Sequence, residues 1–431
     1  MQTSFSPVQL ADPAMASSEG VIRKCVHCGF CTATCPTYVL LGDELDSPRG
    51  RIYLMKEMLE QEAKPTAEVV KHIDRCLSCL SCMTTCPSGV NYMHLVDHAR
   101  AYIEEHYRRP LLQRMLRGML ARILPYQGRF RIALGLAALG RPLAPLFAKI
   151  EALRPLAAML ALAPKSLPHA TAPQTPKPAG GPRVALLQGC AEPVLRPEIR
   201  EATVRLLGRM GCDVVFAPGE GCCGALVHHL GREDDGLAAA RRNVDAWTRE
   251  IENGGLDAVV ITASGCGTTI KDYGFMLRND PAYAERAARV SALACDISEY
   301  VARKGLPEGR APSLTVAYHA ACSLQHGQKV TVQPARLLAD AGFLVRTPAE
   351  AHLCCGSAGT YNILQPEIAG RLRDRKVERL EALAPDVIVT GNIGCATQIA
   401  QGTGIAVLHI AEMLDWATGG PAPSAFAAPA S

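Results

Sequence analysis

Eight of the eighteen cysteines lie in two copies of one regularly spaced string. Each copy reads C-x2-C-x2-C-x3-C-P, and the second follows the first at a displacement of 51 residues. Three thiolates on one short loop can reach three irons of a cubane cluster, and in two-cluster ferredoxins the fourth cysteine binds the other cluster. The spacing therefore predicts two [4Fe–4S] clusters. The expected ligands are Cys25, Cys28, Cys31 and Cys86 for cluster 1, and Cys76, Cys79, Cys82 and Cys35 for cluster 2.

Two other uses of these cysteines fit the pattern less well. A zinc site also contains C-x2-C pairs, but it needs four ligands and does not require three evenly spaced cysteines followed by C-P. A disulfide framework requires an oxidising compartment. Residues 1–20 show neither the basic nor the apolar region of a secretory signal. We therefore expect a cytoplasmic protein whose clusters carry single electrons.

A second repeat of cysteines occupies the C-terminal half. The first set consists of Cys190, Cys222, Cys223 and Cys266, and the second set, 132 or 129 residues later, consists of Cys322, Cys354, Cys355 and Cys395. Each set offers four thiolates, enough for one metal centre. We predict a third and a fourth site here, each for an additional iron–sulfur cluster or for zinc. The alternative interpretation is that both sets are buried free thiols that behave as small apolar side chains.

Several other residues near these sets have simpler interpretations. Cys212 and Cys295 lie outside both sets and are expected to be buried structural residues. Histidines near the cysteines more often donate a hydrogen bond to a sulfur or to a backbone group than bind a metal. We apply this interpretation to His228, His229, His319 and His326.

The elements that must position these cysteines alternate between strands and helices in the C-terminal half. Strands are predicted over 184–187, 213–217, 257–262, 314–318, 343–346 and 386–390, with helices such as 196–210 and 366–383 between them. The cysteines follow the strands, at the edge where open parallel sheets hold their sites. In the N-terminal half, Ser47 and Pro48 are typical of a helix start, so a helix should pack between the two cluster loops.

The predicted fold class is a multi-domain α+β and α/β protein, with a helical two-[4Fe–4S] ferredoxin-like domain followed by two repeated α/β units. The expected divisions are a flexible arm (1–18), the ferredoxin-like domain (19–106), a helical connector (107–163), a Pro/Ala linker (164–182), the first α/β unit (183–311), the second (312–416) and a flexible tail (417–431). In the connector, an apolar face formed by Leu112, Met115 and their neighbours alternates with arginines. Such a helix can lie on a membrane, dock on a partner, or pack on its own core.

Composition excludes several other functions. A net charge of +4 and an aromatic content of 5% give no indication of nucleic-acid binding. No uninterrupted apolar run reaches the ~20 residues of a membrane-spanning helix. The chain also lacks a G-x-G-x-x-G fingerprint, a P-loop, an H-E-x-x-H motif and a G-x-S-x-G elbow. Oxidation of an organic substrate is therefore expected in a separate subunit that carries a flavin.

The chain resembles the iron–sulfur subunits of the glycolate oxidase family. The resemblance lies in the doubled cysteine string, in the two CCG repeats, and in the sequences of residues 25–37, 41–53 and 324–328. Related chains serve anaerobic glycerol-3-phosphate dehydrogenase, lactate utilisation and heterodisulfide reductase. The chain departs from heterodisulfide-reductase relatives, whose repeats end in C-x-x-C, because Thr269 and Gln398 stand where their last cysteines would be.

The resemblance implies a place in a complex. The partners would be FAD-containing subunits that oxidise glycolate to glyoxylate, with FAD bound on the partner only. This chain would pass the electrons towards a membrane or quinone acceptor, as a peripheral protein at the cytoplasmic face of the inner membrane. The alternatives are the same role for a lactate or glycerol-3-phosphate dehydrogenase, and a heterodisulfide-reductase-like enzyme that acts through the CCG domain.

Overall fold

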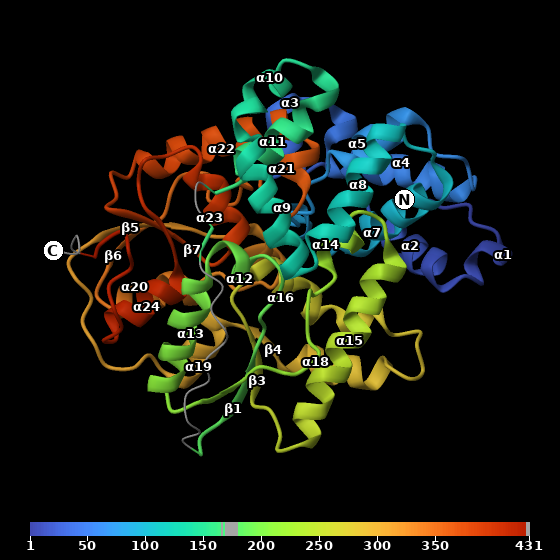
Figure 1. The fold of residues 1–431 in the computed structure, drawn as a ribbon. Helices are drawn as coiled ribbons and strands as arrows, with labels where there is room; N and C mark the ends of the chain where they lie inside the picture. Colours follow the sequence, from blue (N-terminus) through green and yellow to red (C-terminus); the bar gives the residue numbers. More distant parts are fainter. Residues whose placement is uncertain (165–166, 169–179, 428–431) are drawn as a thin grey trace.

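The computed structural model describes residues 1–164, 167–168 and 180–427 of the chain. These residues form a helical N-terminal domain, a helical connector, and two units that are each built on a four-stranded parallel sheet (Figure 1). This arrangement confirms the predicted fold class. The predicted Pro/Ala linker over 164–182 falls largely outside the described residues.

The N-terminal domain is helical around its two cysteine loops. Its elements are α1 (Pro7–Leu10), α2 (Pro13–Lys24), α3 (Pro36–Leu41), η1 (Glu44–Asp46), α4 (Pro48–Glu60), α5 (Ala67–Asp74), α6 (Ser81–Thr85) and α7 (Tyr92–His106). The helix predicted between the loops is α4, which begins where the Ser47 hydroxyl accepts a hydrogen bond from Gly50 N. Ile22, Met55 and Leu95 meet in the core of this domain.

The structure differs from the flexible arm predicted over residues 1–18. Helices α1 and α2 each begin with a proline that follows a capping side chain, Ser6 and Asp12 respectively, and these are strong helix start signals. Met15 packs in the core of the domain, and the Ser18 hydroxyl forms a hydrogen bond of 2.6 Å with His98 Nδ1. The arm is therefore folded against the cluster-bearing helices.

The connector exposes the apolar face of its first helix, for which the sequence left membrane binding, partner docking and core packing open. It contains α8 (Leu111–Ile123), α9 (Gln127–Gly140), η2 (Arg141–Leu143), α10 (Ala144–Ala148), η3 (Glu151–Leu153) and α11 (Arg154–Leu162). In α8 the side chain of Met115 is 62% exposed, whereas Arg117 is only 8% exposed and donates to the carbonyl of Leu230. Helical periodicity separates the two faces of α8, but Asp74 and Glu104 beside Arg117 decide that the arginine faces inward.

One part of the connector is longer and more apolar than the sequence interpretation allowed. The residues Gln127–Ala148 form a run of 22 helical residues that could cross a membrane by length and composition, and only 6% of the tested stretch is buried. The expectation that no segment reaches this length is wrong because Pro142 and Pro145 stand at the starts of helical turns and do not interrupt the run. A single helix of this kind is weak evidence for a membrane span.

The two α/β units repeat one sheet topology. The first sheet contains β1 (Arg183–Leu186), β2 (Asp213–Val215), β3 (Ala258–Ile261) and β4 (Ala294–Asp296), in the order β2-β1-β3-β4. The second contains β5 (Thr315–His319), β6 (Leu344–Arg346), β7 (Val387–Thr390) and β8 (Val407–His409), in the order β6-β5-β7-β8. All pairs are parallel, and the register of Val184 with Ala258 recurs as Val316 with Val387. Strands β4 and β8 were not predicted.

The two units pack against each other reciprocally. Helix α13 (Pro197–Arg209) of the first unit lies against α24 (Ile410–Ala417) of the second, and α20 (Gln333–Asp340) of the second lies against α19 (Ile297–Lys304) of the first (Figure 1). Val214 and Val260 of one sheet share a single apolar core with Val316 and Val389 of the other. The two sheets therefore stabilise one another.

A buried carboxylate links the two units and provides a test of this interface. Asp415 of α24 is 1% exposed and receives hydrogen bonds from Arg205 and Arg209 of α13. Because Asp415→Ala removes a buried acceptor of hydrogen bonds from two partly exposed guanidinium groups, we expect the free energy of unfolding to fall by about 2 kcal/mol in anaerobic denaturant titrations of the full chain. The exposed pair Arg336–Asp340 supplies the control, since Asp340→Ala should cost less than about 1 kcal/mol. Equal costs would show that the Asp415 pairs do not stabilise the interface.

Candidate metal centres

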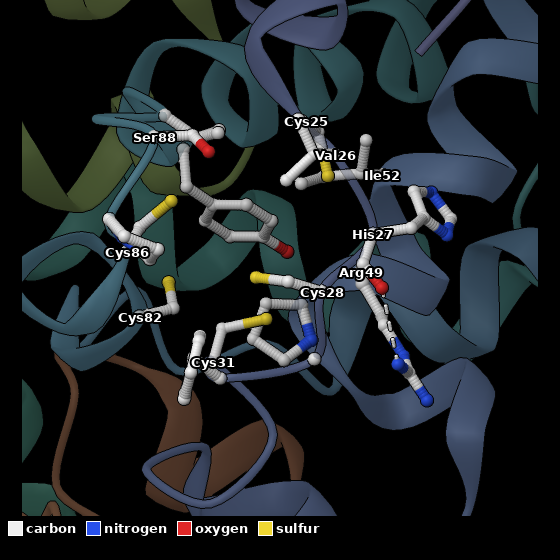
Figure 2. Close-up of a pocket in the computed structure, with 16 residues that line it drawn as sticks. Cys25, Val26, His27, Cys28, Cys31, Arg49, Ile52, Cys82, Cys86 and Ser88 are labelled. Carbon is white, nitrogen blue, oxygen red and sulfur yellow. Dashed lines mark hydrogen bonds between the residues drawn. The ribbon is translucent and has the colours of Figure 1, made fainter.

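The first hollow in the N-terminal domain is lined by sulfurs from both cysteine strings. Cys25, Cys28 and Cys31 enter it from the first loop, and Cys82 and Cys86 from the second. Figure 2 shows the sulfur atoms of these five residues directed towards one space. Cys28 is exposed, so this hollow lies at the surface of the molecule. The four residues expected to hold cluster 1 are thus brought together.

A second hollow collects the other four expected ligands. Cys76, Cys79 and Cys82 line it from the second loop, and Cys35 reaches it from the first. Cys82 therefore borders both hollows, which places the two sites directly beside each other. The fourth cysteine of each string crosses to the other hollow, as the spacing predicts.

The two cysteine loops share positive φ values at equivalent positions. In the first loop His27 and Gly29 have φ values of 55° and 86°, and in the second loop Ser78 and Leu80, 51 positions later, have φ values of 49° and 62°. Left-handed residues at alternate positions bend the chain tightly enough for neighbouring thiols to face one centre. At Gly29 a β-carbon would lie 2.6 Å from Arg49 Nη1, the end of a flexible side chain that can move, so the positive φ is the stronger reason for glycine there.

A buried arginine stands beside the second hollow. Arg51 of α4 is 1% exposed; its Nη1 approaches Cys35 Sγ at 3.8 Å and its Nη2 donates to Asp46 Oδ1 at 3.2 Å. Asp46 also contacts His72 Nδ1 at 2.9 Å and Arg75 Nη1 at 2.8 Å. Asp43, Asp46 and His72 lie close enough to hold a metal ion, but Asp46 and His72 are already committed to these contacts. Sequence reasoning missed Arg51, because an arginine within a predicted helix is normally exposed.

The chemistry of these thiols fits iron–sulfur clusters. None of the eighteen cysteines, all of which lie in the described part of the chain, forms a disulfide. Burial raises the pKa of Cys31 to about 11, and it raises the pKa values of Cys79 and Cys82 well above the ordinary thiol value. Such thiols stay protonated at neutral pH until a metal binds the thiolate. Two adjacent sets of four soft sulfur donors suit two clusters.

The cysteines of the first α/β unit gather at the carboxyl ends of its strands. Cys190 follows β1, the pair Cys222 and Cys223 follows β2, and Cys266 lies in α16 (Ser264–Lys271) after β3. Hydrogen bonds from the thiols of Cys190 and Cys223 lower the pKa of Cys222, so these sulfurs are in contact. The glycine of CCG, Gly224, has a φ of 87°, and a β-carbon there would lie 2.9 Å from the carbonyl of Gly236.

The second unit repeats this arrangement. Cys322 Sγ lies 3.8 Å from Cys354 Sγ, and the thiol of Cys355 forms hydrogen bonds with Cys354 and Cys395. Gly356 has the same φ of 87° as Gly224, and a β-carbon there would lie 2.5 Å from the carbonyl of Ala369. Both CCG motifs therefore use glycine to let a helix approach the paired cysteines closely.

The second unit also lies against the second hollow. Leu77 and Cys79 share an apolar cluster with Cys354 and Tyr361, and the Tyr361 hydroxyl donates to the carbonyl of Arg75 at 3.0 Å. Thr84, between Cys82 and Cys86, forms a hydrogen bond of 2.8 Å with His326 Nδ1. The cysteine set of the second unit is thus the neighbour of the site predicted for cluster 2.

Three of the four histidines near the cysteines have ordinary partners. His228 and His229 contact Asp97 of α7, at 3.6 and 3.4 Å. His326 lies between Thr84 and the carbonyl of His352. His319 differs, since neither of its ring nitrogens has a hydrogen-bond partner within the described residues. Cys212 and Cys295 are buried in the structure.

Comparisons with known proteins agree with these sites. A family model described as a 4Fe-4S dicluster domain matches residues 24–90, and one described as a cysteine-rich domain matches residues 184–271 and 316–400. The chain is 42% identical to the "Glycolate oxidase iron-sulfur subunit" of Escherichia coli (strain K12), over 97% of this chain and 99% of the relative. The chain belongs to the glycolate oxidase iron–sulfur subunit family.

Other relatives lie further away. The "Probable glycolate oxidase iron-sulfur subunit" of Bacillus subtilis (strain 168) is 33% identical over 93% of this chain and 95% of the relative. "Lactate utilization protein A" of Bacillus licheniformis is 30% identical over 54% of this chain and 99% of the relative. A crystal structure of a hypothetical protein from Helicobacter pylori shares the fold, with a TM-score of 0.54 and 12% identity, over 95% of this chain and 73% of that chain.

Membership of this family makes the chain an iron–sulfur component of an oxidoreductase. The dicluster match spans both cysteine strings, and the two cysteine-rich matches span both CCG units up to their last cysteines. Electron transfer through iron–sulfur clusters is the chemistry that such cysteine sets support.

The contacts of Arg51 give a test of the second hollow. We expect Arg51→Gln to lower the free energy of unfolding by about 3 kcal/mol, because Asp46 stays buried with less compensating charge. Loss of a cation next to Cys35 should also make the reduction potential of the adjacent cluster more negative. Anaerobic denaturation and an EPR-monitored redox titration measure the two effects. Lys56→Gln on the same helix is the control, since its pair with Glu60 should be worth less than about 1 kcal/mol. An unchanged potential in Arg51→Gln would show that this arginine does not tune the cluster.

Proposed function

We propose that the chain is the electron-transfer subunit of a complex that oxidises glycolate to glyoxylate. In this function a partner flavoprotein oxidises the substrate, and the chain passes the electrons towards a membrane or quinone acceptor. The observation that carries the proposal is the pair of adjacent cysteine-lined hollows that meet at Cys82, in a chain that is 42% identical to a glycolate oxidase iron–sulfur subunit along almost its whole length.

The chemistry requires two kinds of subunit. Oxidation of the alcohol of glycolate to the aldehyde of glyoxylate releases two electrons and two protons. A flavin can accept the electrons as a pair and release them singly, whereas each [4Fe–4S] cluster accepts one. In this chain the eight cysteines Cys25, Cys28, Cys31, Cys35, Cys76, Cys79, Cys82 and Cys86 would hold the clusters side by side. FAD then belongs to the partner.

The first hollow is where we expect the flavoprotein to dock. Cys28 is exposed there, and two apolar side chains beside it, Val26 and Phe30, are 66% and 63% exposed. Exposed apolar side chains around a reactive site are typical of a protein interface. The second hollow lies deeper, against the second α/β unit. Electrons would therefore enter at the first cluster and move inward.

The alternatives change the donor or the catalytic domain. A lactate dehydrogenase is less favoured, because "Lactate utilization protein A" aligns with only 54% of this chain. With a glycerol-3-phosphate dehydrogenase as the electron donor, this chain would have the same electron-transfer role. A heterodisulfide-reductase-like reaction in the CCG units is disfavoured by Thr269 and Gln398, which stand where the closing cysteines of those relatives would be. The four-thiol sets of both units can hold a further iron–sulfur cluster or zinc.

Substrate-dependent dye reduction tests the proposed function. We expect the full chain, purified anaerobically with its partner subunits, to support dye reduction with glycolate more strongly than with D-lactate or glycerol-3-phosphate. Cys79→Ala should reduce this activity to background and lower the iron content, because a ligand of the second cluster is lost. Cys212→Ala removes a buried thiol outside all four sets and should retain both. Activity with D-lactate alone would show that the chain accepts electrons from a lactate dehydrogenase instead. Full turnover of Cys79→Ala would contradict the cluster assignment.

We further propose that the complex lies in the cytoplasm and attaches to the inner face of the membrane through the connector. Six apolar side chains at helical spacing along Gln127–Ala148 and just beyond it are exposed: Ile132, Leu136, Leu139, Leu143, Leu146 and Ile150. Residues 107–150 contain nine Lys or Arg and no Asp or Glu, whereas the whole chain has a net charge of only +4. Arg109 and Arg117 are buried beside Asp74 and Glu104, which leaves seven basic side chains for a lipid surface. An apolar stripe within a basic stretch is complementary to anionic lipid.

Vesicle flotation tests this attachment. We expect the intact complex to float with vesicles that contain phosphatidylglycerol, and to bind pure phosphatidylcholine vesicles less strongly. The triple variant Ile132→Ser, Leu136→Ser and Leu139→Ser removes part of the apolar stripe without entering a core, and should shift most of the protein to the unbound fraction. Val332→Ser, an exposed apolar site in the second α/β unit, is the control. If the triple variant instead loses its flavoprotein partner and wild type does not float, the stripe is a subunit interface.

A further inference from the structure

His319 is a buried histidine with no visible role in the fold. It stands at the end of β5 and is 1% exposed. Neither Nδ1 nor Nε2 has a hydrogen-bond partner among the described residues. Buried polar atoms in native proteins are nearly always satisfied, so an unsatisfied ring calls for a physical explanation such as an ion at the site.

The side chain of His319 lies beside the sulfur atoms of the second cysteine set. One of its ring nitrogens and the Sγ atoms of Cys355 and Cys395 all lie within 4.8 Å of one another. Cys355 is in contact with Cys354, whose Sγ lies 3.8 Å from that of Cys322. The unit thus places four thiols and one imidazole at the ends of three adjacent strands, β5, β6 and β7.

The first α/β unit has no counterpart of this histidine. Cys190 and Cys322 differ by 132 positions, and so do Val184 and Val316, which hold the same register in the two sheets. Leu187 therefore occupies the position that corresponds to His319. Leu187 packs in the apolar core of the first unit together with Cys223. An apolar residue thus fills this position in a repeat with the same four cysteines, so the histidine is not needed for the fold.

Two further observations favour a redox-active metal over zinc. The group lies against the second hollow of the ferredoxin-like domain, where Cys79 shares an apolar cluster with Cys354. A buried cation, Lys376, lies within electrostatic reach of Cys322, Cys354 and Cys355, and would offset part of the charge of a thiolate centre.

We propose that the second α/β unit binds an additional iron–sulfur centre in which His319 supplies an imidazole ligand beside Cys322, Cys354, Cys355 and Cys395. The proposal rests on the proposed electron-transfer function, since it makes this centre the next carrier after the second cluster. A centre whose ligands include a neutral imidazole carries less negative charge than a centre with thiolate ligands only, and its reduction potential is therefore higher, as in Rieske centres. The centre is therefore suited to accept electrons from the all-cysteine clusters.

Nitrogen hyperfine coupling tests the ligand directly. The full complex is prepared anaerobically with ¹⁵N-histidine and reduced in steps, and pulsed EPR is recorded. We expect one reduced centre of the wild type to show ¹⁵N coupling, and iron to exceed the roughly eight atoms per chain of two [4Fe–4S] clusters. His319→Cys should keep the iron, lose the coupling and shift the potential of that centre to a more negative value. His319→Ala should lower the iron content by up to one centre.

The control is another buried histidine of the same sheet. His409 ends β8, but its Nε2 pairs with the carbonyl of Thr262 and its Nδ1 accepts from Ala411 N. His409→Gln should therefore leave both the iron content and the ¹⁵N coupling unchanged. The signals of the two ferredoxin-like clusters report whether each variant is folded, and the wild-type coupling does not depend on any variant.

Three results would overturn the proposal. They are wild-type centres without ¹⁵N coupling, iron that is equal in wild type and His319→Ala, and stoichiometric zinc that is lost from His319→Ala. Glycolate-dependent dye reduction is measured on the same preparations. Loss of that activity with a retained ¹⁵N coupling would contradict the proposed function alone, whereas full activity without coupling would contradict the histidine ligand alone.

Discussion

The exchange of one cysteine between the two strings is the constraint on which the N-terminal domain depends. Cys35 leaves the first loop to line the second hollow, and Cys86 leaves the second loop to line the first. Two loops that are 51 residues apart must therefore lie against each other before either site is complete. Helix α4 fills the space that this arrangement leaves, and its Arg51 occupies the boundary between Cys35 and Asp46.

A second requirement of these cysteine sets is that positive side chains lie near them to offset the negative charge of thiolates. Each of the four cysteine sets has a basic side chain within reach. Arg49 lines the first hollow, Arg51 approaches Cys35, Arg242 donates to the carbonyl of Cys222, and Lys376 lies near the thiols of the second unit. Unpaired buried charge is costly, so an anionic metal centre bound at any of these sets would be stabilised by the cation beside it. The fold of each set is thus linked to the charge that it holds.

Much of this organisation could be predicted from the sequence because its signals are local or periodic. Each of the six predicted strands ended within two residues of an observed strand end, and the displacements of 132 and 129 residues indicated the duplicated units. Strands β4 and β8 were missed because, unlike the equally short β2 and β6, neither is followed by a cysteine motif, and each is recognised as a strand only by its pairing with β3 or β7. Tertiary partners also decided the burial of Arg51 and Arg117, which no helical periodicity can show. His319 was assigned an ordinary hydrogen bond, since its lack of a partner is visible only in three dimensions.

The reciprocal packing of α13 on α24 and of α20 on α19 has the form of an isologous contact between two copies of one subunit. The shared core that contains Val214 and Val316 would be open to water in a single unit, so an ancestral unit of this kind would have existed as a symmetric homodimer. In a homodimer every substitution appears in both copies. Joining the copies in one chain removes that restriction, and it allows one half to keep leucine at 187 while the other acquires histidine at 319. A single chain that carries both units can therefore hold two different sites.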